Sequence, residues 1–162
     1  MGKGNGTIAS HPLELVHVDL LTHFSDQTEF TSVLVAIDNA SSFTYVKPLC
    51  RKANALHVFQ EWIKYAKIQT RCQLKIIHSN NGGEWSSNVA MHWQNKAGFR
   101  WKKSSVYTSK QNGKAKRTIC TIQNIINSML HTHQLPQTFW PYTIEATAFT
   151  KNLLLNIKNK IP

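Results

Sequence analysis

Two apolar runs near the N-terminus constrain the fold of this chain most strongly. Residues 15–21 read L-V-H-V-D-L-L and residues 32–38 read S-V-L-V-A-I-D, so both faces of each segment carry mainly apolar side chains. Such segments are typical of central strands that are covered on both sides. The turn at 39–42 and the β-rich segment 43–49 follow directly. The three segments therefore predict an antiparallel meander, ending at Pro48.

Helical periodicity dominates most of the remaining chain. Apolar residues at three-and-four spacing predict helices over about 53–69 and from Ala115 to Met129, with a shorter helix at 88–97. A last helix is expected over about 137–155. Its inward-facing residues are predicted to be Phe139, Trp140, Ile144, Ala148 and Leu153. Strands at 74–78 and 99–103 complete an α/β fold with a five-stranded mixed sheet flanked by helices, in which cations mark 99–103 as an edge strand.

The length and net charge of the chain limit how many domains it can form and which classes of partner it can bind. Its 162 residues fit one domain, assigned to 11–162, after a flexible leader or cloning remnant at 1–10. The net charge of +11 favours a polyanionic partner, with nucleic acid ahead of an anionic membrane. The longest apolar runs fall far short of the roughly 20 residues that a membrane span needs, so no membrane partner is expected. The three cysteines are widely separated, which argues against disulfides and structural zinc and predicts reduced, mostly buried thiols.

Two-metal phosphodiester chemistry needs carboxylates that converge from different segments, which makes acidic residues at strand ends candidate metal ligands. Asp19 lies at the end of the first strand. The fourth strand continues into S-N-N-G-G-E at 79–84, and V-Y-T-S-K-Q-N-G-K-A-K-R at 106–117 opens the long helix. These segments resemble the catalytic core of retrotransposon integrases, most closely the Ty1/copia type, whose pattern reads P-L-E-L-x-H-x-D, x-S-D-N-G-G-E and Y-T-P-Q-Q-N-G-x-A-E-R. The resemblance spans about residues 11–162 and implies an RNase H-like fold.

The resemblance also assigns the positions of the family's Asp-Asp-Glu triad. They fall on Asp19, Asn80 and Lys116, and the last two are separated by the family's interval of 35 residues. Only Asp19 keeps its carboxylate. The three side chains sum to zero charge at neutral pH, whereas the family's triad carries three negative charges for Mg²⁺ or Mn²⁺. We therefore expect no bound metal and no strand-transfer or 3′-processing activity.

Other residues near the triad positions were considered as substitutes. Glu84 could replace a missing carboxylate, but it matches the end of the family's own D-N-G-G-E segment and is more simply explained by a role in that loop. Asp38 is interpreted as a turn-initiating residue. His17 and His78 are interpreted as core or edge residues and not as metal ligands. Lys116 could form a salt bridge with Asp19 and close the former site.

Cations gather around the start of the long helix, where the partial positive charge of a helix N-terminus makes them unfavourable unless an anion binds. A phosphate would suit this position, and nearby amides could bond to sugars or bases. Trp85 is considered as a base-stacking residue, against the simpler interpretation that it packs under the loop. The expected nucleic-acid-binding residues are Lys102, Lys103, Lys110, Gln111, Asn112, Lys114, Lys116 and Arg117.

The sequence thus predicts an integrase-core-like domain from a retrotransposon polyprotein that binds nucleic acid, with DNA favoured, and has lost catalysis. One alternative is an active metal-dependent polynucleotidyl transferase or nuclease using Asp19 with Glu84. Another is a scaffold whose basic surface binds only protein. The resemblance further implies a possible homodimer and an intracellular, nuclear place of action.

Overall fold

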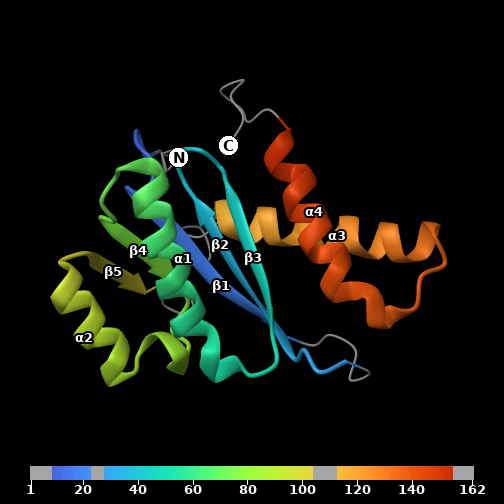
Figure 1. Cartoon of the computed structure of the whole chain (residues 1–162), viewed down its shortest axis with the longest axis horizontal. Helices are drawn as coiled ribbons and strands as arrows, with labels where there is room; N and C mark the ends of the chain where they lie inside the picture. The colour runs from blue at the N-terminus through green and yellow to red at the C-terminus, as the bar shows by residue number, and fades with distance from the viewer. Residues whose placement is uncertain (1–8, 23–27, 104–112, 155–162) are drawn as a thin grey trace, which may run out of the picture.

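A mixed sheet of five strands forms the centre of the molecule, and a computed structural model describes it together with the rest of residues 9–22, 28–103 and 113–154. Strands β1 (Leu15–Thr22), β2 (Ser32–Asp38) and β3 (Thr44–Leu49) form an antiparallel meander. Strands β4 (Ile76–Ser79) and β5 (Arg100–Lys103) join it in parallel on the other side of β1. The order β3-β2-β1-β4-β5 confirms the predicted meander, the mixed sheet and the edge position of β5 (Figure 1).

Helices cover the two faces of this sheet. Figure 1 shows α1 (Ala55–Thr70) and α2 (Asn88–Ala97) on one side, and α3 (Gly113–Thr132) and α4 (Trp140–Leu153) on the other. Single 3₁₀ turns occur at η1 (Lys52–Asn54), η2 (Gly83–Trp85) and η4 (Gln137–Phe139). Helix α2 begins where the Ser87 hydroxyl accepts the Ala90 N–H and ends at Gly98, whose φ of 70° suits glycine. None of the described helices is long and apolar enough to cross a bilayer.

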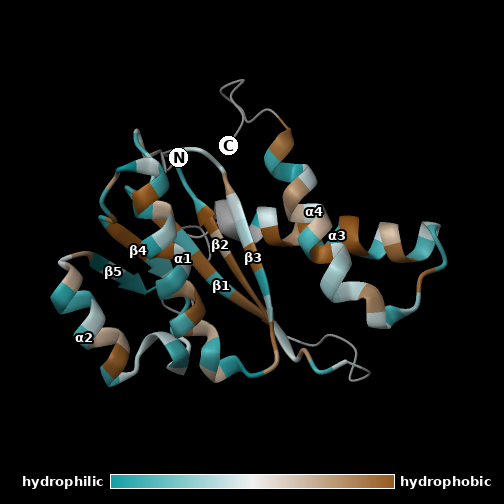
Figure 2. Ribbon diagram, in the orientation of Figure 1, coloured by the Kyte–Doolittle hydropathy of each residue, from teal (hydrophilic) through white to brown (hydrophobic). Residues whose placement is uncertain are grey.

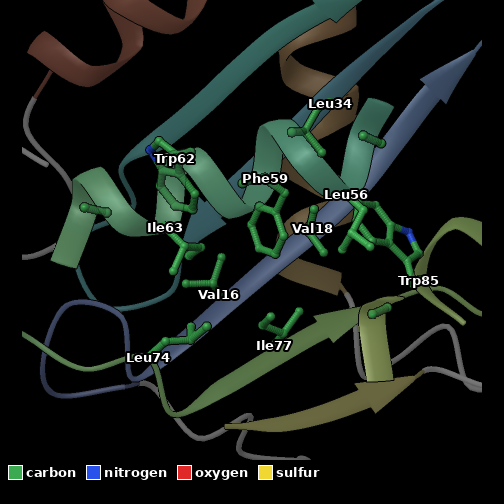
Figure 3. Packing of buried hydrophobic residues seen from close by; sticks show 14 of the residues in the cluster. Val16, Val18, Leu34, Leu56, Phe59, Trp62, Ile63, Leu74, Ile77 and Trp85 are labelled. Carbon is green, nitrogen blue, oxygen red and sulfur yellow. The ribbon is translucent and has the colours of Figure 1, made fainter. Parts of the chain in front are cut away.

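The alternation of side chains along β2 divides the core in two. Leu34 and Ala36 face α1, whereas Val33, Val35 and Ile37 face α3 and α4. Figure 3 shows Phe59, Trp62 and other α1 side chains packed on the first face, and Figure 2 shows hydrophobic colour concentrated in the central strands. Both faces of β2 are therefore buried, as its continuous apolar sequence predicts.

Some details differ from the sequence-based predictions. Strand β3 continues through Pro48 to Leu49, because an edge strand tolerates a missing N–H. Helix α4 starts at Trp140, and its inward face carries Trp140, Ile144 and Ala148. Its pitch leaves Phe139 and Leu153 exposed, so their predicted inward positions are wrong.

The prediction of mostly buried thiols is also wrong. The cysteines are free, but two of them are exposed and the third is half-buried. Cys50 is exposed because it follows the edge strand β3, and Cys120 is exposed because it occupies the outer face of α3. Cys72 is the half-buried cysteine.

Candidate functional site

The parallel pairing of β1 with β4 brings two of the triad positions together. His17 is in register with His78, and Asp19 and Asn80 each lie two residues further along their chains. Because side chains alternate along strands, all four belong to the face of the sheet that α3 and α4 cover. The Asn80 Nδ2 group donates a hydrogen bond of 2.8 Å to Asp19 Oδ1. The spatial relation implied by the sequence motifs is therefore present at these two positions.

The orientation of the Asn80 amide follows from its second partner. The Gly82 N–H, which can only donate, lies 3.0 Å from Asn80 Oδ1. The oxygen of the amide therefore faces Gly82 and its NH₂ group faces Asp19. Asp19 Oδ1 also accepts the N–H of Leu20 at 2.9 Å. Two donors thus point at Oδ1, one of the two oxygens that the Asp19 carboxylate could offer a metal.

These contacts test whether the residues fit a divalent metal. Hard cations bind lone pairs on carboxylate and carbonyl oxygens. At this position, an N–H donor stands where a second carboxylate oxygen would face the metal, and the Asn80 oxygen is engaged by Gly82. Among the described residues, no three His, Cys, Asp or Glu side chains come together in a way that could hold a metal ion. The arrangement of Asp19 and Asn80 does not fit a two-metal site.

Helix α3 supplies the third position. Its first turn begins at Gly113 and includes residue 116, and Ile119 and Ile122 of the helix belong to the hydrophobic cluster that includes side chains of β1 and β2. The side chains of Lys114 and Lys116 lie outside the described residues. The predicted pairing of Lys116 with Asp19 therefore stays a prediction.

Two buried histidines lie on the same face, one step before the site. The rings of His17 and His78 meet edge to face with centroids 5.4 Å apart. Asn39 accepts the Ala9 N–H through Oδ1, so its Nδ2 group faces His17 Nε2 at 3.2 Å as a donor. This amide orientation makes His17 Nε2 the acceptor of the contact. This contact matches the interpretation of His17 as a core residue.

Glu84, the suggested substitute ligand, is committed elsewhere. It belongs to η2, where its side chain is only 9% exposed and pairs with Lys52 at 3.5 Å. Lys52 begins η1, the turn that leads into α1. The carboxylate also lies against Gly82, because a Cβ built on this glycine would collide with it. Glu84 therefore holds the loop between β4 and α2, as its place in the motif suggested.

Trp85 is buried, which confirms the simpler interpretation that it packs under the loop and leaves no face for base stacking. It is 1% exposed and packs against Phe59 and Trp101, with ring centroids 6.0 Å away in both cases. The short turn η2 directs the ring inward, onto α1. Trp101 in turn donates through Nε1 to Ser79 Oγ at 2.9 Å, which ties β5 to the end of β4. No sequence motif indicated this bond.

The described part of the predicted basic set lies on β5 and α3. Register places Lys102 beside His78 and Lys103 beside Ser79, both exposed. Lys103 Nζ donates to Ser86 Oγ at 2.9 Å, and Arg117 is exposed on α3. The predicted residues Lys110, Gln111 and Asn112 lie outside the described part of the chain.

Two further acids hold the segments that lead into β1 and out of β2. Asp38 is 3% exposed and accepts the N–H groups of Leu13 at 2.8 Å and Ser41 at 2.7 Å, which confirms its turn role. The Glu14 carboxylate accepts the Ser10 N–H and pairs with Lys75. These donors, the Ser10 amide foremost, lower the pKa of Glu14 to about 2. Sequence reasoning predicted the turn but not the bond to Leu13.

No family model matches the chain. Among curated proteins, it is similar to the retrovirus-related Pol polyprotein from transposon TNT 1-94 of Nicotiana tabacum, with 32% identity over 116 residues. That match covers 72% of this chain and 9% of the relative. The Pol polyprotein from transposon RE2 of Arabidopsis thaliana is 23% identical over 152 residues, which cover 93% of this chain and 10% of the relative. The chain spans about a tenth of the length of these relatives.

Solved structures share the fold at low identity. A chain of the simian T-cell lymphotropic virus intasome in complex with a PP2A regulatory subunit superimposes with a TM-score of 0.78 and 16% identity, covering 99% of this chain and 56% of its own. The HTLV-2 integrase catalytic core domain in complex with magnesium gives 0.69 and 17%, covering 93% and 94%. The RNase H-like fold implied by the sequence motifs is confirmed.

Proposed function

We propose that this chain, an integrase-core-like domain homologous to part of Ty1/copia-type retrotransposon Pol polyproteins, binds nucleic acid without cutting or joining it. The observation that carries the proposal is the hydrogen bond from Asn80 to Asp19. It supports a former metal position at which a donor now faces the remaining carboxylate.

The loss of charge supports inactivity. Two divalent ions held about 3.5–4 Å apart activate the attacking oxygen and stabilise the leaving oxygen. The three carboxylates of an Asp-Asp-Glu set would neutralise most of the positive charge of these ions. The charges of Asp19, Asn80 and Lys116 sum to zero, so they would not. Removing a single electrostatic stabiliser from an active site already costs about 10²–10³ in rate, so losing the metals would remove many orders of magnitude.

Exposed cations around the site support nucleic-acid binding. Lys102 and Lys103 project from the end of β5, and Arg117 lies on α3. The first turn of α3 adds Lys114 and Lys116 at the positive end of the helix dipole. With a net charge of +11, the domain offers phosphates a favourable field. We expect it to act on DNA inside the cell, in the nucleus.

A binding assay with matched charge changes tests this proposal. The double variant Lys110→Glu with Lys114→Glu should weaken binding to a DNA duplex and reduce its dependence on salt. Lys64→Glu with Lys67→Glu makes the same charge change on α1, on the opposite face of the sheet, and should affect binding less. Equal effects of the two double variants, or binding indifferent to salt, would contradict the proposed surface and favour a protein scaffold. DNA cleavage or joining that Asp19→Ala abolishes would instead restore the enzyme alternative.

We also propose that two copies associate through α4. Its exposed apolar side chains recur on one face at Tyr142, Phe149 and Leu153, which are 68%, 67% and 57% exposed. The HTLV-2 core domain with magnesium has been solved in dimeric and trimeric forms. Phe149→Glu should shift the chain toward monomer in sedimentation experiments. Tyr65→Glu, a matched change at an exposed aromatic side chain of α1, should not. A monomeric unmodified chain at high concentration would contradict this assignment.

A further inference from the structure

The two edges of the sheet are finished differently. At the β3 edge, the Asn152 amide at the end of α4 bonds to both backbone groups of Thr44. Its Oδ1 accepts the Thr44 N–H at 2.9 Å and its Nδ2 donates to the Thr44 carbonyl at 2.8 Å. Lys151 adds a bond to the Ser42 carbonyl. Side chains of α4 thus take the place of a neighbouring strand at the first residue of β3, where they satisfy the outward backbone groups of this edge.

The β5 edge has no such cover among the described residues. The Arg100 N–H donates inward to the Lys75 carbonyl at 2.8 Å. Because backbone groups alternate along a parallel ladder, those of Lys102 also point to β4 and those of Trp101 and Lys103 point outward. No described residue bonds to these outward groups. Figure 1 shows β5 at the outer margin of the sheet, away from α3 and α4.

Positive charge surrounds this open edge. Arg100, Lys102 and Lys103 are exposed, and none forms a salt bridge within the described residues. Figure 2 shows β5 coloured as hydrophilic along its length. A shallow depression of about 550 Å³ opens where the strand begins. It is lined by Lys75, Ile76, Gln94, Gly98, Phe99 and Arg100.

We infer that the open edge of β5 binds an acidic polypeptide segment in extended conformation, as an added sixth strand. An extended peptide offers alternating N–H and C=O groups at the strand spacing, which match the outward groups of Trp101 and Lys103. Carboxylates on the peptide would face Arg100 and Lys102, and one could enter the depression. This edge would therefore bind a second kind of partner, in addition to the nucleic acid proposed above.

Charge and hydrogen bonding favour this occupant over two others at the outward backbone groups of β5. A second copy of β5 would bring three cations against three, and like charges on an edge strand oppose self-pairing. A DNA backbone offers phosphate oxygens, which accept the N–H groups but leave the outward carbonyls of Trp101 and Lys103 without donors. An acidic peptide satisfies both kinds of backbone group and the side chains together.

Peptide binding with a paired substitution tests the inference. The probe is a labelled ten-residue peptide of alternating Glu and Val, followed by fluorescence anisotropy and by NMR of the ¹⁵N-labelled chain. Both Lys103→Ala and Lys103→Pro remove the charge and the bond from Nζ to Ser86. Lys103→Pro also removes the outward N–H without touching the ladder to β4. We expect the proline variant to bind about fivefold more weakly than the alanine variant, the equivalent of one backbone hydrogen bond. Equal affinities for the two variants would overturn the inference.

A second measurement leaves the protein unchanged and so does not depend on the folding of a variant. Two versions of the peptide carry N-methyl groups on alternate residues, one on the odd and one on the even positions. Only one set of N–H groups can face β5, so one version should lose binding and the other should keep it. The amide signals of Trp101 and Lys103 should shift with the bound peptide. Binding of both methylated versions, or shifts at these amides caused by a DNA duplex and not by the peptide, would refute added-strand binding.

Discussion

Restoring only the second carboxylate, by Asn80→Asp, should destabilise this fold at neutral pH. The change replaces the 2.8 Å hydrogen bond between Asn80 and Asp19 with two like charges at the same place. At that separation the repulsion is about 1.5 kcal/mol in bulk water and about 6 kcal/mol at an effective dielectric constant of 20. The site is half-buried and the side chains can move apart, so we expect a loss of about 2–4 kcal/mol in the free energy of unfolding.

Acid should relieve this penalty. Like charge disfavours ionisation of the second carboxylate, so one of the two acids takes up a proton at a higher pH in the folded than in the unfolded chain. The penalty is therefore largest at neutral pH, shrinks as pH falls through the raised pKa of the folded chain, and is gone below the ordinary Asp pKa of about 3.9. Urea unfolding at several pH values measures it directly.

The neighbouring residue provides a matched control. Asn81→Asp adds the same charge one position later, at an exposed side chain. It should change the free energy of unfolding by less than about 0.5 kcal/mol. If both variants were equally stable at pH 7, the contact between positions 19 and 80 would not exist and the site assignment would fail.

Three further predictions concern residues around the site. Because Glu14 has a folded pKa of about 2, its stabilisation is complete above the ordinary value of 4.5 and is lost as pH falls toward 2; Glu14→Gln should flatten this part of the acid-unfolding profile. Gly82→Ala should cost about 1 kcal/mol or less in denaturant unfolding, because its Cβ meets only the carboxylate end of the flexible Glu84 side chain, which can move, whereas Gly83→Ala meets nothing within 4 Å and should be nearly neutral. Trp85→Ala should cost about 3–5 kcal/mol by the same measurement, and a folded Trp85→Ala chain that lost DNA binding selectively would contradict its packing role.

Much of the sheet could be predicted from local patterns. The two-sided apolar run of β2 required cover on both faces, and the structure divides its side chains between α1 and the pair α3 and α4. The family resemblance assigned Asp19 and Asn80 to one site, and the parallel pairing of β1 with β4 brings the two positions together in the structure. Period and motif order were sufficient for these features.

Tertiary geometry determined what the sequence left open. The inward face of α4 depends on the residue at which the helix starts. Because it starts at Trp140, Phe139 and Leu153 lie at the surface and not in the core as predicted. The bonds of Asn152 to Thr44 join residues 108 positions apart and follow no periodicity. The direction of Trp85 depends on the turn η2, which a tight glycine loop alone does not specify.

Calorimetric titration with Mn²⁺ tests the central claim most directly. The unmodified chain and the double variant Asn80→Asp with Lys116→Glu are titrated side by side. We predict no heat of binding for the unmodified chain and a clear binding isotherm for the double variant, which a further Asp19→Ala change abolishes. Binding heat in the unmodified chain that Asp19→Ala removes would contradict the claim that this position has lost its metal site.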